Sequence, residues 1–346
     1  MKNRSILSGY LLSSLYFGVS VFGPSANAKE TRKLLVTLMG EDNIAIINPA
    51  DGAVKTKIPV GGEPHDVICS SDGKWAYVSN PKTDDFSVID IEKASVHKTI
   101  PFTKGYLPWH VEISQDDSKV FVALQHASRI AVINTANFKV SYIHTPEKFP
   151  GPWAISTPKG GTKVYVSLNG SIPGGTANSG TRVGVFDSAR TNPKMKTIRV
   201  GKGPHGMIAS PDGTSVYVAN QYSHEIWKID VATDKAKLLA KIAGEAAPAP
   251  GFPTDVAVSP DGKFLLTGNH DIDSVTLINA ESGAIVATVK TGPKSLPWGG
   301  TFDSDSARAF IANNGTDDMH IVDLGSKTIS KTVSIGKGPD GMAWCR

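Results

Sequence analysis

Short apolar runs rich in β-branched and aromatic residues recur along the whole chain, separated by polar turn residues. Six nearly continuous runs end in or beside an amide residue and cover residues 75–80, 120–125, 164–169, 216–220, 264–269 and 309–314. A further run that ends in Asp or Asn follows each of them, at residues 86–90, 130–134, 183–187, 226–230, 275–279 and 320–323. This composition and spacing predict β-strands joined in hairpins, and no stretch has a sustained helical period.

The runs belong to a repeat that is marked by proline. Seven prolines each precede a short apolar strand and a turn, and they stand at positions 64, 108, 152, 204, 253, 297 and 339. Their spacing of about 44 residues is typical of a propeller or another repeat array. Each unit is predicted to contain four strands: the run after proline, the two runs described above, and an alternating strand such as residues 54–60 or 285–292.

The two ends of the repeat complement each other. The seventh unit stops after its first strand, while residues 33–40 and 43–48 form a second and a third strand that lack a first. We therefore predict an all-β, seven-bladed propeller with four-stranded blades, closed by pairing of the N-terminal strands with the C-terminal strand. Closure would also remove the exposed sheet edges of an open array. The predicted domain covers residues 29–346.

Residues 1–28 have the features of a secretory signal peptide. Lys2 and Arg4 precede an apolar stretch. The segment ends in Ala26-Asn27-Ala28, a small-x-small motif typical of the residues just before a cleavage site. A transmembrane anchor is the alternative, but the stretch is short and interrupted by Gly and Ser. We expect a periplasmic or secreted protein without a membrane span.

Composition narrows the choice of partners. The net charge of +4 is too small to predict a nucleic-acid binder. Two cysteines are too few for a disulfide-dense scaffold or a Cys-type zinc site. We expect a monomer that binds a small ligand or a protein partner.

Three of the second-strand runs carry a motif that resembles a known repeat. Residues 77–80 (YVSN), 217–220 (YVAN) and 310–313 (FIAN) look like the YVTN motif, and Ser-Pro-Asp-Gly turns stand at residues 210–213 and 259–262. The chain thus resembles the YVTN-type seven-bladed β-propeller repeat family over nearly all of residues 29–346. That resemblance implies an exported or surface protein. Similar propellers form the haem domain of dissimilatory nitrite reductase and the copper domain of nitrous oxide reductase, and others resemble lactonases.

Two sets of residues are expected to converge near the axis on one face of the propeller. The first set follows each proline and consists of His65, Trp109, Trp153, His205, Thr254, Trp298 and Asp340, with Asp66, His110 and Asp255 one position further. The second set ends the second strands and includes Asn80, Gln125, Asn169, Asn220, Asn269 and Asn313, with His126 and His270 just beyond. These residues are candidates for ligand binding, although both sets can equally serve the packing of the repeat.

Imidazoles in the two sets make a transition metal or a haem-type group conceivable as a cofactor, since imidazole binds Zn, Cu, Fe and Ni. His65, His110 and His126 come from neighbouring units and form the candidate metal set. Opposite positions on a wide ring would keep His65 and His205 from sharing one ion. The sequence itself does not identify the cofactor.

The leading hypothesis for function is an exported, non-catalytic binding or scaffold protein that uses the axial face. The alternative is a periplasmic oxidoreductase or cofactor-handling protein that depends on a metal or a haem-type group. A metal-dependent, lactonase-like hydrolase is a weaker alternative, because Asp66, Asp255 and the amides only partly supply a metal shell.

The two cysteines, Cys69 and Cys345, both lie in first strands of blades that closure makes neighbours. An oxidising compartment permits a disulfide between them. The alternative is two free thiols buried as small apolar side chains. A separation of the Cα atoms below about 7 Å would allow the bridge.

Overall fold

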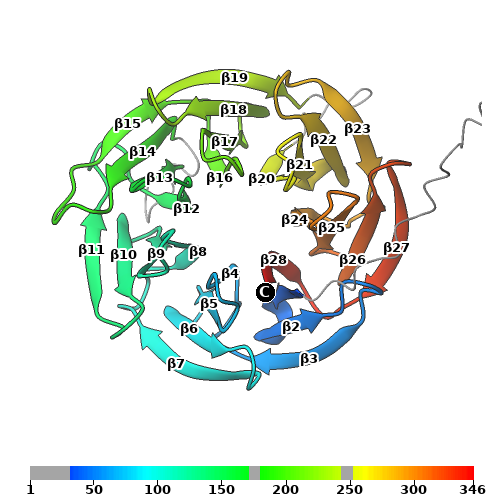
Figure 1. The fold of residues 1–346 in the computed structure, drawn as a ribbon, viewed down its shortest axis with the longest axis horizontal. Coiled ribbons are helices and arrows are strands. Elements are labelled where there is room, and N and C mark those ends of the chain that lie inside the picture. Colours follow the sequence, from blue (N-terminus) through cyan, green and yellow to red (C-terminus); the bar gives the residue numbers. More distant parts are fainter. Residues whose placement is uncertain (1–31, 171–179, 243–251) are drawn as a thin grey trace, which may run out of the picture. The chain divides into compact units, whose positions relative to one another are not determined.

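Seven four-stranded antiparallel sheets surround a central axis in the computed structural model (Figure 1). The structure describes residues 32–170, 180–242 and 252–346, so the predicted signal peptide at residues 1–28 lies outside the described residues. The prediction of an all-β, seven-bladed propeller is confirmed. Helix is limited, in the described part of the chain, to two 3-10 turns, η1 (Met39–Glu41) and η2 (His270–Ile272).

Each blade has its first strand nearest the axis and its fourth strand at the rim (Figure 1). Blade 1 contains β28 (Pro339–Cys345), β1 (Lys33–Leu38), β2 (Asn43–Ile47) and β3 (Val54–Pro59). Blade 2 contains β4 (Val67–Cys69), β5 (Trp75–Asn80), β6 (Asp85–Asp90) and β7 (Ser95–Pro101). Blade 3 contains β8 (Pro108–Ile113), β9 (Lys119–Leu124), β10 (Arg129–Asn134) and β11 (Val140–His144).

The remaining four blades follow in chain order. Blade 4 contains β12 (Pro152–Ser156), β13 (Lys163–Leu168), β14 (Arg182–Asp187) and β15 (Lys196–Arg199). Blade 5 contains β16 (Pro204–Ala209), β17 (Ser215–Asn220), β18 (Glu225–Asp230) and β19 (Lys235–Lys241). Blade 6 contains β20 (Pro253–Val258), β21 (Phe264–Asn269), β22 (Ser274–Asn279) and β23 (Ile285–Lys290). Blade 7 contains β24 (Pro297–Phe302), β25 (Arg308–Asn313), β26 (Asp318–Asp323) and β27 (Thr328–Ser334).

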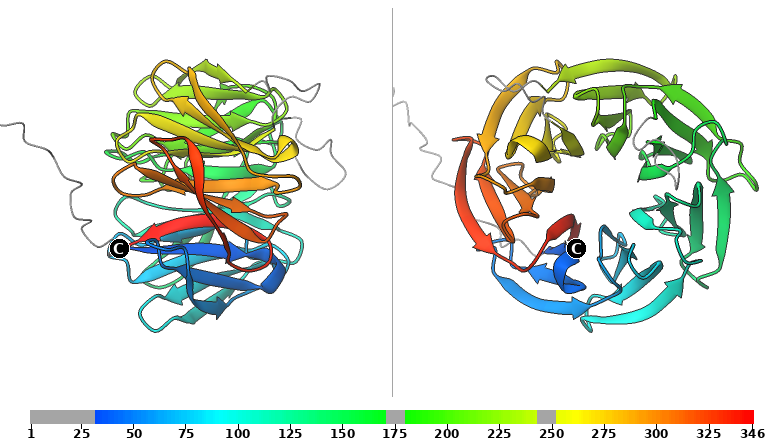
Figure 2. Two further views of the ribbon diagram at one scale, coloured as in Figure 1. Left: turned by 90° about the vertical axis from the view of Figure 1, so that its right-hand side faces the viewer. Right: turned by 180° about the vertical axis from the view of Figure 1, so that it is seen from behind.

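The two ends of the propeller meet in blade 1, as the sequence predicts. Strand β28 pairs antiparallel with β1, in a register that places Lys33 opposite Cys345 and Leu35 opposite Ala343. Figure 2 shows β28 beside the N-terminal strands in both views. Because β1 also pairs with β2, neither side of β1 is left as an open edge.

The second strands are buried on both faces, because each lies inside a blade that is packed between two others. Strands β9, β13 and β25 have the same burial pattern, with a partly exposed first residue and five buried residues after it. This explains why their sequences are continuous apolar runs rather than alternating ones. The apolar clusters lie between blades: one joins Leu35 and Ala343 of blade 1 to Ile89 of blade 2, and another joins Leu34 of blade 1 to Phe310 of blade 7.

The rim strands alternate between inward and exposed residues. In β19, Lys235, Lys237 and Lys241 are exposed, while Ala240 is buried. Charged lysines on an outer strand oppose pairing with a strand of another molecule. The rim is thereby protected without a further layer of structure.

The cysteines lie in the first strands of adjacent blades. Cys69 ends β4 of blade 2 and Cys345 ends β28 of blade 1. Their Cα atoms are 5.5 Å apart and the two residues form a disulfide that spans 276 positions of the chain. The bridge ties the last strand to the blade that follows the N-terminal strands.

We expect Cys345→Ser to lower the free energy of unfolding, because the bridge restricts the unfolded chain. Chain-entropy arguments for a loop of this length give about 5 kcal/mol as an upper value. Denaturant unfolding of the oxidised protein measures the loss, and Cys69→Ser should reproduce it. Two reactive thiols in denatured protein that has not met a reductant would contradict the bridge.

Candidate functional site

In blades 3 to 7, the residues that follow the repeat proline are displaced from the sheet by a bulge. In blade 5, Pro204 pairs with Asn220 and Met207 pairs with Val218, so that His205 and Gly206 together face a single residue of β17. The same shift occurs in the first strands of blades 3, 4, 6 and 7. A bulge of this kind re-aims side chains. It directs the first candidate set toward the axis.

Hydroxyl groups of the second strands hold these bulges in place. Ser167 Oγ of blade 4 donates to the carbonyl of His205 in blade 5 at 2.7 Å. Thr37 in blade 1 donates in the same way to the carbonyl of His65 in blade 2, and Ser79 in blade 2 donates to that of Trp109 in blade 3. Each hydroxyl therefore fixes the axial backbone of the next blade around the ring.

Aromatic rings from several blades meet at the axis. Trp109 and Trp153 stack with centroids 4.7 Å apart. The ring of His65 contacts the edges or faces of three indoles, with centroid distances of 4.7 Å to Trp109, 5.8 Å to Trp153 and 6.1 Å to Trp298. The ring of His205 lies 4.1 Å from Trp153 and 6.0 Å from Trp298. His65 and His205 contact the same two indoles, so their opposite positions on the ring do not keep them far apart at the axis.

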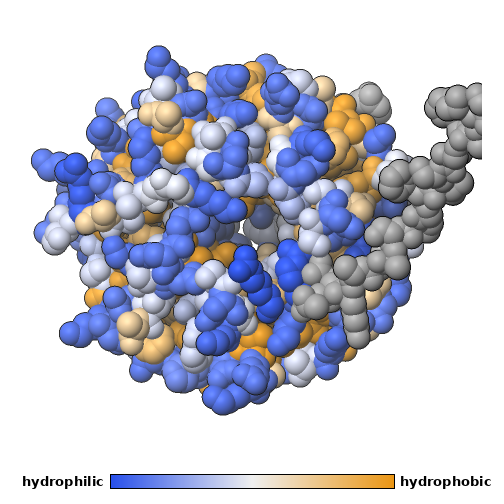
Figure 3. All heavy atoms as spheres, in the orientation of Figure 1, coloured by the Kyte–Doolittle hydropathy of each residue, from blue (hydrophilic) through white to orange (hydrophobic). Residues whose placement is uncertain are grey.

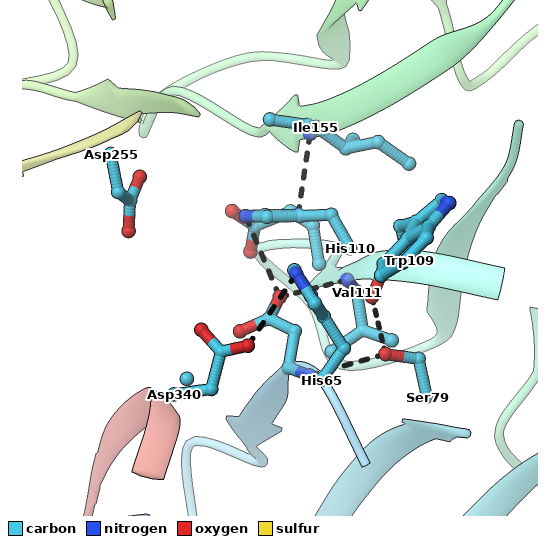
Figure 4. Close-up of polar contacts among 12 residues, drawn as sticks. His65, Ser79, Trp109, His110, Val111, Ile155, Asp255 and Asp340 are labelled. Carbon is cyan, nitrogen blue, oxygen red and sulfur yellow. Dashed lines mark hydrogen bonds and ion pairs between the residues drawn. The ribbon is translucent and has the colours of Figure 1, made fainter. Parts of the chain in front are cut away.

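A cavity of about 30 Å³ lies among these rings. The polar side chains along its wall include His65, Asp66, His110, His205, Asp255 and Asp340, and the indoles of Trp153 and Trp298 complete the wall. This volume is enough for about two water-sized groups. Figure 3 shows the propeller hollowed near its axis. In Figure 4 the carboxyl groups of Asp255 and Asp340 and the ring of His110 face the same space.

Two side chains in this wall keep unpaired polar atoms although they are almost fully buried. His65 is 6% exposed and neither of its ring nitrogens makes a hydrogen bond of normal length and angle, although the nearby backbone of Trp109 opposes the lowering of its pKa. Asp340 is 1% exposed and its Oδ1 atom is likewise unpaired. His65 Nε2 is 3.7 Å from Asp340 Oδ2, which is too long for a hydrogen bond. An unpaired buried polar group costs about 1–3 kcal/mol.

Hydrogen bonds fix the orientation of the other two imidazoles. His205 Nδ1 donates to the carbonyl of Thr254 at 2.7 Å, which leaves its Nε2 atom as an acceptor. His110 Nδ1 accepts from the amide of Ile155 at 3.3 Å, so its proton is on Nε2, 3.5 Å from Asp66 Oδ2. Both rings are therefore held by backbone groups of the next blade.

Burial dominates the electrostatics of the site. It lowers the pKa of His65 to about 3, helped by the neighbouring His205 and His110, and it lowers the pKa of His205 to about 3. Burial also raises the pKa of Asp255 to about 6. The pKa of Asp340 is raised well above its usual value by burial and then by Asp66 and Asp255. Burial thus disfavours the charged form of both His65 and Asp340 in the absence of a partner, and the 3.7 Å between them leaves both groups open to one.

The structure divides the predicted ligand-binding residues into two groups. The larger group, namely His65, His110, Trp153, His205, Asp255 and Trp298, lines the cavity. Trp109 is stacked behind Trp153 and donates from Nε1 to Gln125 Oε1 at 2.8 Å. Gln125 therefore positions an indole rather than facing the cavity.

The predicted amide residues do not line the cavity. Asn80 donates to Asp85 and Ser87, Asn269 donates to Ser274 and Thr276, and Asn220 donates to the carbonyl of Val218. These bonds stay within their own blades, and those of Asn80 and Asn269 hold the hairpin to the third strand. In this structure these amides stabilise turns.

The candidate metal set is not assembled. Among residues 32–170, 180–242 and 252–346, no group of three or more His, Cys, Asp or Glu could hold a metal ion. His65 and His110 face different carboxyl groups, and His126 is not part of the cavity wall. Proximity of blades along the chain did not determine which way the imidazoles point.

Glu112 is a polar residue near this site that the sequence analysis missed. It lies on β8, two residues after His110, and its Oε1 atom accepts from the amide of Ile113 at 2.8 Å. Burial raises its pKa to about 7. The sequence does contain a signal for it. The other first strands carry an uncharged residue at the equivalent position, namely Ile68, Ser156, Ile208, Ala257, Thr301 and Ala343.

No helix in the described ranges is long and apolar enough to cross a membrane.

The profile of the YNCE-like beta-propeller family matches residues 165–307, in blades 4 to 7. The YVTN-type assignment stays a prediction. A 6-phosphogluconolactonase of Enterobacter sp. (strain 638) is 31% identical over 83 residues, which is 24% of each chain. The match thus spans about a quarter of that relative.

Solved structures show the same fold at low identity. Hydrazine synthase of Kuenenia stuttgartiensis has a TM-score of 0.71 and 19% identity over 84% of this chain and 92% of that one. The dihydro-heme d1 dehydrogenase NirN has a TM-score of 0.64 and 14% identity over 88% of this chain and 64% of that one. At these identities the similarity concerns the fold alone.

We expect Glu112→Gln to stabilise the protein above about pH 7. The folded-state pKa of Glu112 lies above its ordinary value of 4.5, so the folded protein keeps a proton that the unfolded chain loses. Stability is therefore lost as the pH rises from about 4.5 to about 7. The substitution keeps the acceptor for Ile113 and should recover about 1–3 kcal/mol at pH 8.

Unfolding midpoints of both proteins across pH 4–8 test this expectation. Asp255 titrates in the same direction, so the variant should retain a smaller slope of stability against pH. Identical curves for the two proteins would show that Glu112 does not carry the effect.

Proposed function

We propose that this protein is an exported, non-catalytic binding protein that holds a small polar ligand in its axial cavity. The observation that supports this proposal is the presence of unpaired, buried polar atoms on His65 and Asp340 in the cavity wall. At the equivalent repeat position of the next blade, by contrast, Trp109 Nε1 is paired with Gln125. A ligand that pairs with these atoms would offset the cost of burying them.

The cavity is too small for the cofactor of the alternative hypothesis. A pocket for a drug-sized organic molecule has roughly 300–1,000 Å³, whereas this one has about 30 Å³. A haem-type macrocycle would require the indoles of Trp153 and Trp298 to move apart. This argues against a haem-dependent oxidoreductase with its cofactor at the axis.

A sugar-phosphate lactone is also a poor match. The cavity wall contains three carboxyl side chains, from Asp66, Asp255 and Asp340, and none of its lining residues is Lys or Arg. A phosphate group needs cationic or amide donors. The resemblance to a 6-phosphogluconolactonase therefore supports the fold but not that substrate at this site.

Export is supported by two independent features. Residues 1–28 have the pattern of a signal peptide, and the bridge between Cys69 and Cys345 is typical of an oxidising compartment. Such a bridge is rare in the cytosol of mesophiles.

Closing the cavity tests the binding proposal. Gly299 has no neighbour closer than 3.5 Å to an added Cβ, and the nearest atoms are the carbonyl of Asp340 and Oδ2 of Asp255. We expect a small molecule to copurify with the native protein, and Gly299→Val to fill the cavity and abolish its binding. Native mass spectrometry of protein from its own compartment measures this.

Gly161→Val is the matched control, because Gly161 lies in open space on the surface. It should leave the bound molecule in place. A native protein that carries no molecule and whose thermal stability does not respond to a small-molecule screen would overturn the proposal.

Fractionation of cells tests export. We expect the protein in the periplasmic or secreted fraction, with Lys29 as its first residue by mass spectrometry. A variant without residues 2–28 should remain in the cytoplasm with both thiols reduced. Cytoplasmic full-length protein with residues 1–28 still attached would contradict export.

A further inference from the structure

The cavity wall has more hydrogen-bond acceptors than donors. Asp66 comes from blade 2, Asp255 from blade 6 and Asp340 from blade 1, and all three line the same space. Carboxylates only accept hydrogen bonds when ionised. No lysine or arginine lines the cavity, so the imidazoles are the only basic side chains in the wall that face these carboxyl groups.

The imidazoles add acceptors to this wall. His205 uses its Nδ1 proton on the carbonyl of Thr254, so that only the acceptor Nε2 remains. His110 directs its Nε2 proton toward Asp66, which lies in the same wall. Neutral His65 offers one N–H donor and one acceptor, so acceptors still outnumber donors in the wall, and a ligand that donates hydrogens suits it better than one that only accepts them.

The unpaired atoms distinguish this cluster from an ordinary acidic surface. Asp340 is buried and keeps one oxygen unpaired, and His65 keeps two unpaired nitrogens. Both residues contribute to the cavity wall. A solvated acidic patch would satisfy such atoms with water at no cost.

Aromatic faces complete the chemistry. Trp153 and Trp298 line the cavity, and the edge of His65 contacts both indoles. Indole faces attract cations, and more strongly when the cation is desolvated. Carboxyl groups and indoles together are the surroundings in which proteins hold an organic cation.

We infer that the axial cavity binds a small primary ammonium ion, either ammonium itself or a short alkylammonium such as methylammonium. This inference rests on the proposed function. The N–H groups of the ion donate to Asp66, Asp255 and Asp340, and the alkyl group contacts the indoles. With room for about two water-sized groups, the cavity excludes quaternary and branched amines.

The first experiment compares the binding of four probes to the purified protein that begins at Lys29. Ammonium chloride, methylammonium chloride, potassium chloride and methanol are titrated by calorimetry and by intrinsic tryptophan fluorescence, to which Trp153 and Trp298 contribute. Potassium has the charge of ammonium but no hydrogens, and methanol has the shape of methylammonium but no charge. We expect binding of the two ammonium ions and at least tenfold weaker binding of potassium and methanol.

The second experiment removes one acceptor charge. We expect Asp255→Asn to weaken methylammonium binding about tenfold or more, since charge-assisted hydrogen bonds are about twice as strong as neutral ones. The variant keeps an oxygen that accepts from the amide of Val256, as Asp255 does at 2.8 Å. This should preserve the local fold.

Asp51→Asn is the matched control. Asp51 is exposed in the turn between β2 and β3, is not part of the cavity wall, and accepts from the amide of Ala53 at 3.0 Å. The substitution makes the same change in net charge and should leave methylammonium binding unchanged.

The outcomes separate this inference from the binding proposal. Equal binding of potassium and ammonium, or of methanol and methylammonium, overturns the ammonium inference but leaves a cavity ligand. Equal loss of binding in Asp255→Asn and Asp51→Asn overturns it as well, because the effect would then be one of net charge. If none of the probes binds but native mass spectrometry detects another bound molecule, the ammonium inference is overturned and the binding proposal stands. An empty cavity in both experiments overturns both.

Discussion

Pairing of β28 with β1 is the constraint on which the propeller depends. Every blade buries its apolar faces against two neighbours, and blade 1 obtains its neighbours only because both ends of the chain contribute strands to it. Its residues pack against Ile89 of blade 2 on one side and Phe310 of blade 7 on the other. Opening this pair would expose both clusters at once, so closure and core formation are one event. The bridge between Cys69 and Cys345 reinforces the same junction.

Closure also creates the axial site. A bulge in the first strand of one blade would only bend that strand, but repeated around the ring it brings pairs of residues to a common centre. Small residues make room there: an added Cβ on Gly206 would collide with Asp255, and one on Gly341 would collide with the backbone of His65. The cavity therefore results from glycine at some repeat positions and polar side chains at others. The scaffold is common to all blades, and the chemistry comes from the differences among them.

The period of the prolines was enough to predict the fold, the closure and the axial position of His65, Trp153, His205 and Trp298, because a propeller of this kind places equivalent residues at equivalent radii. The period was not enough to predict where the side chains of the amide residues point. Register shows that Pro108 pairs with Leu124 whereas Pro204 pairs with Asn220, so Gln125 is one residue beyond the position of Asn220. The direction of an imidazole, such as that of His110 toward Asp66, depends on a backbone amide in another blade. Such contacts leave no mark in a single sequence.

Comparison of residues at equivalent repeat positions shows which side chains are not explained by packing of the blades. Trp109 and His65 occupy the same position in adjacent blades, and both have their carbonyls held by a hydroxyl of the preceding blade. The indole nitrogen of Trp109 is paired with Gln125, yet both ring nitrogens of His65 are left unpaired in a buried site. A fourth indole would meet the packing at the axis without this cost, since Trp109, Trp153 and Trp298 already occupy equivalent positions. A histidine that is buried, neutral and unpaired where an indole would fit is better explained by a ligand than by the fold.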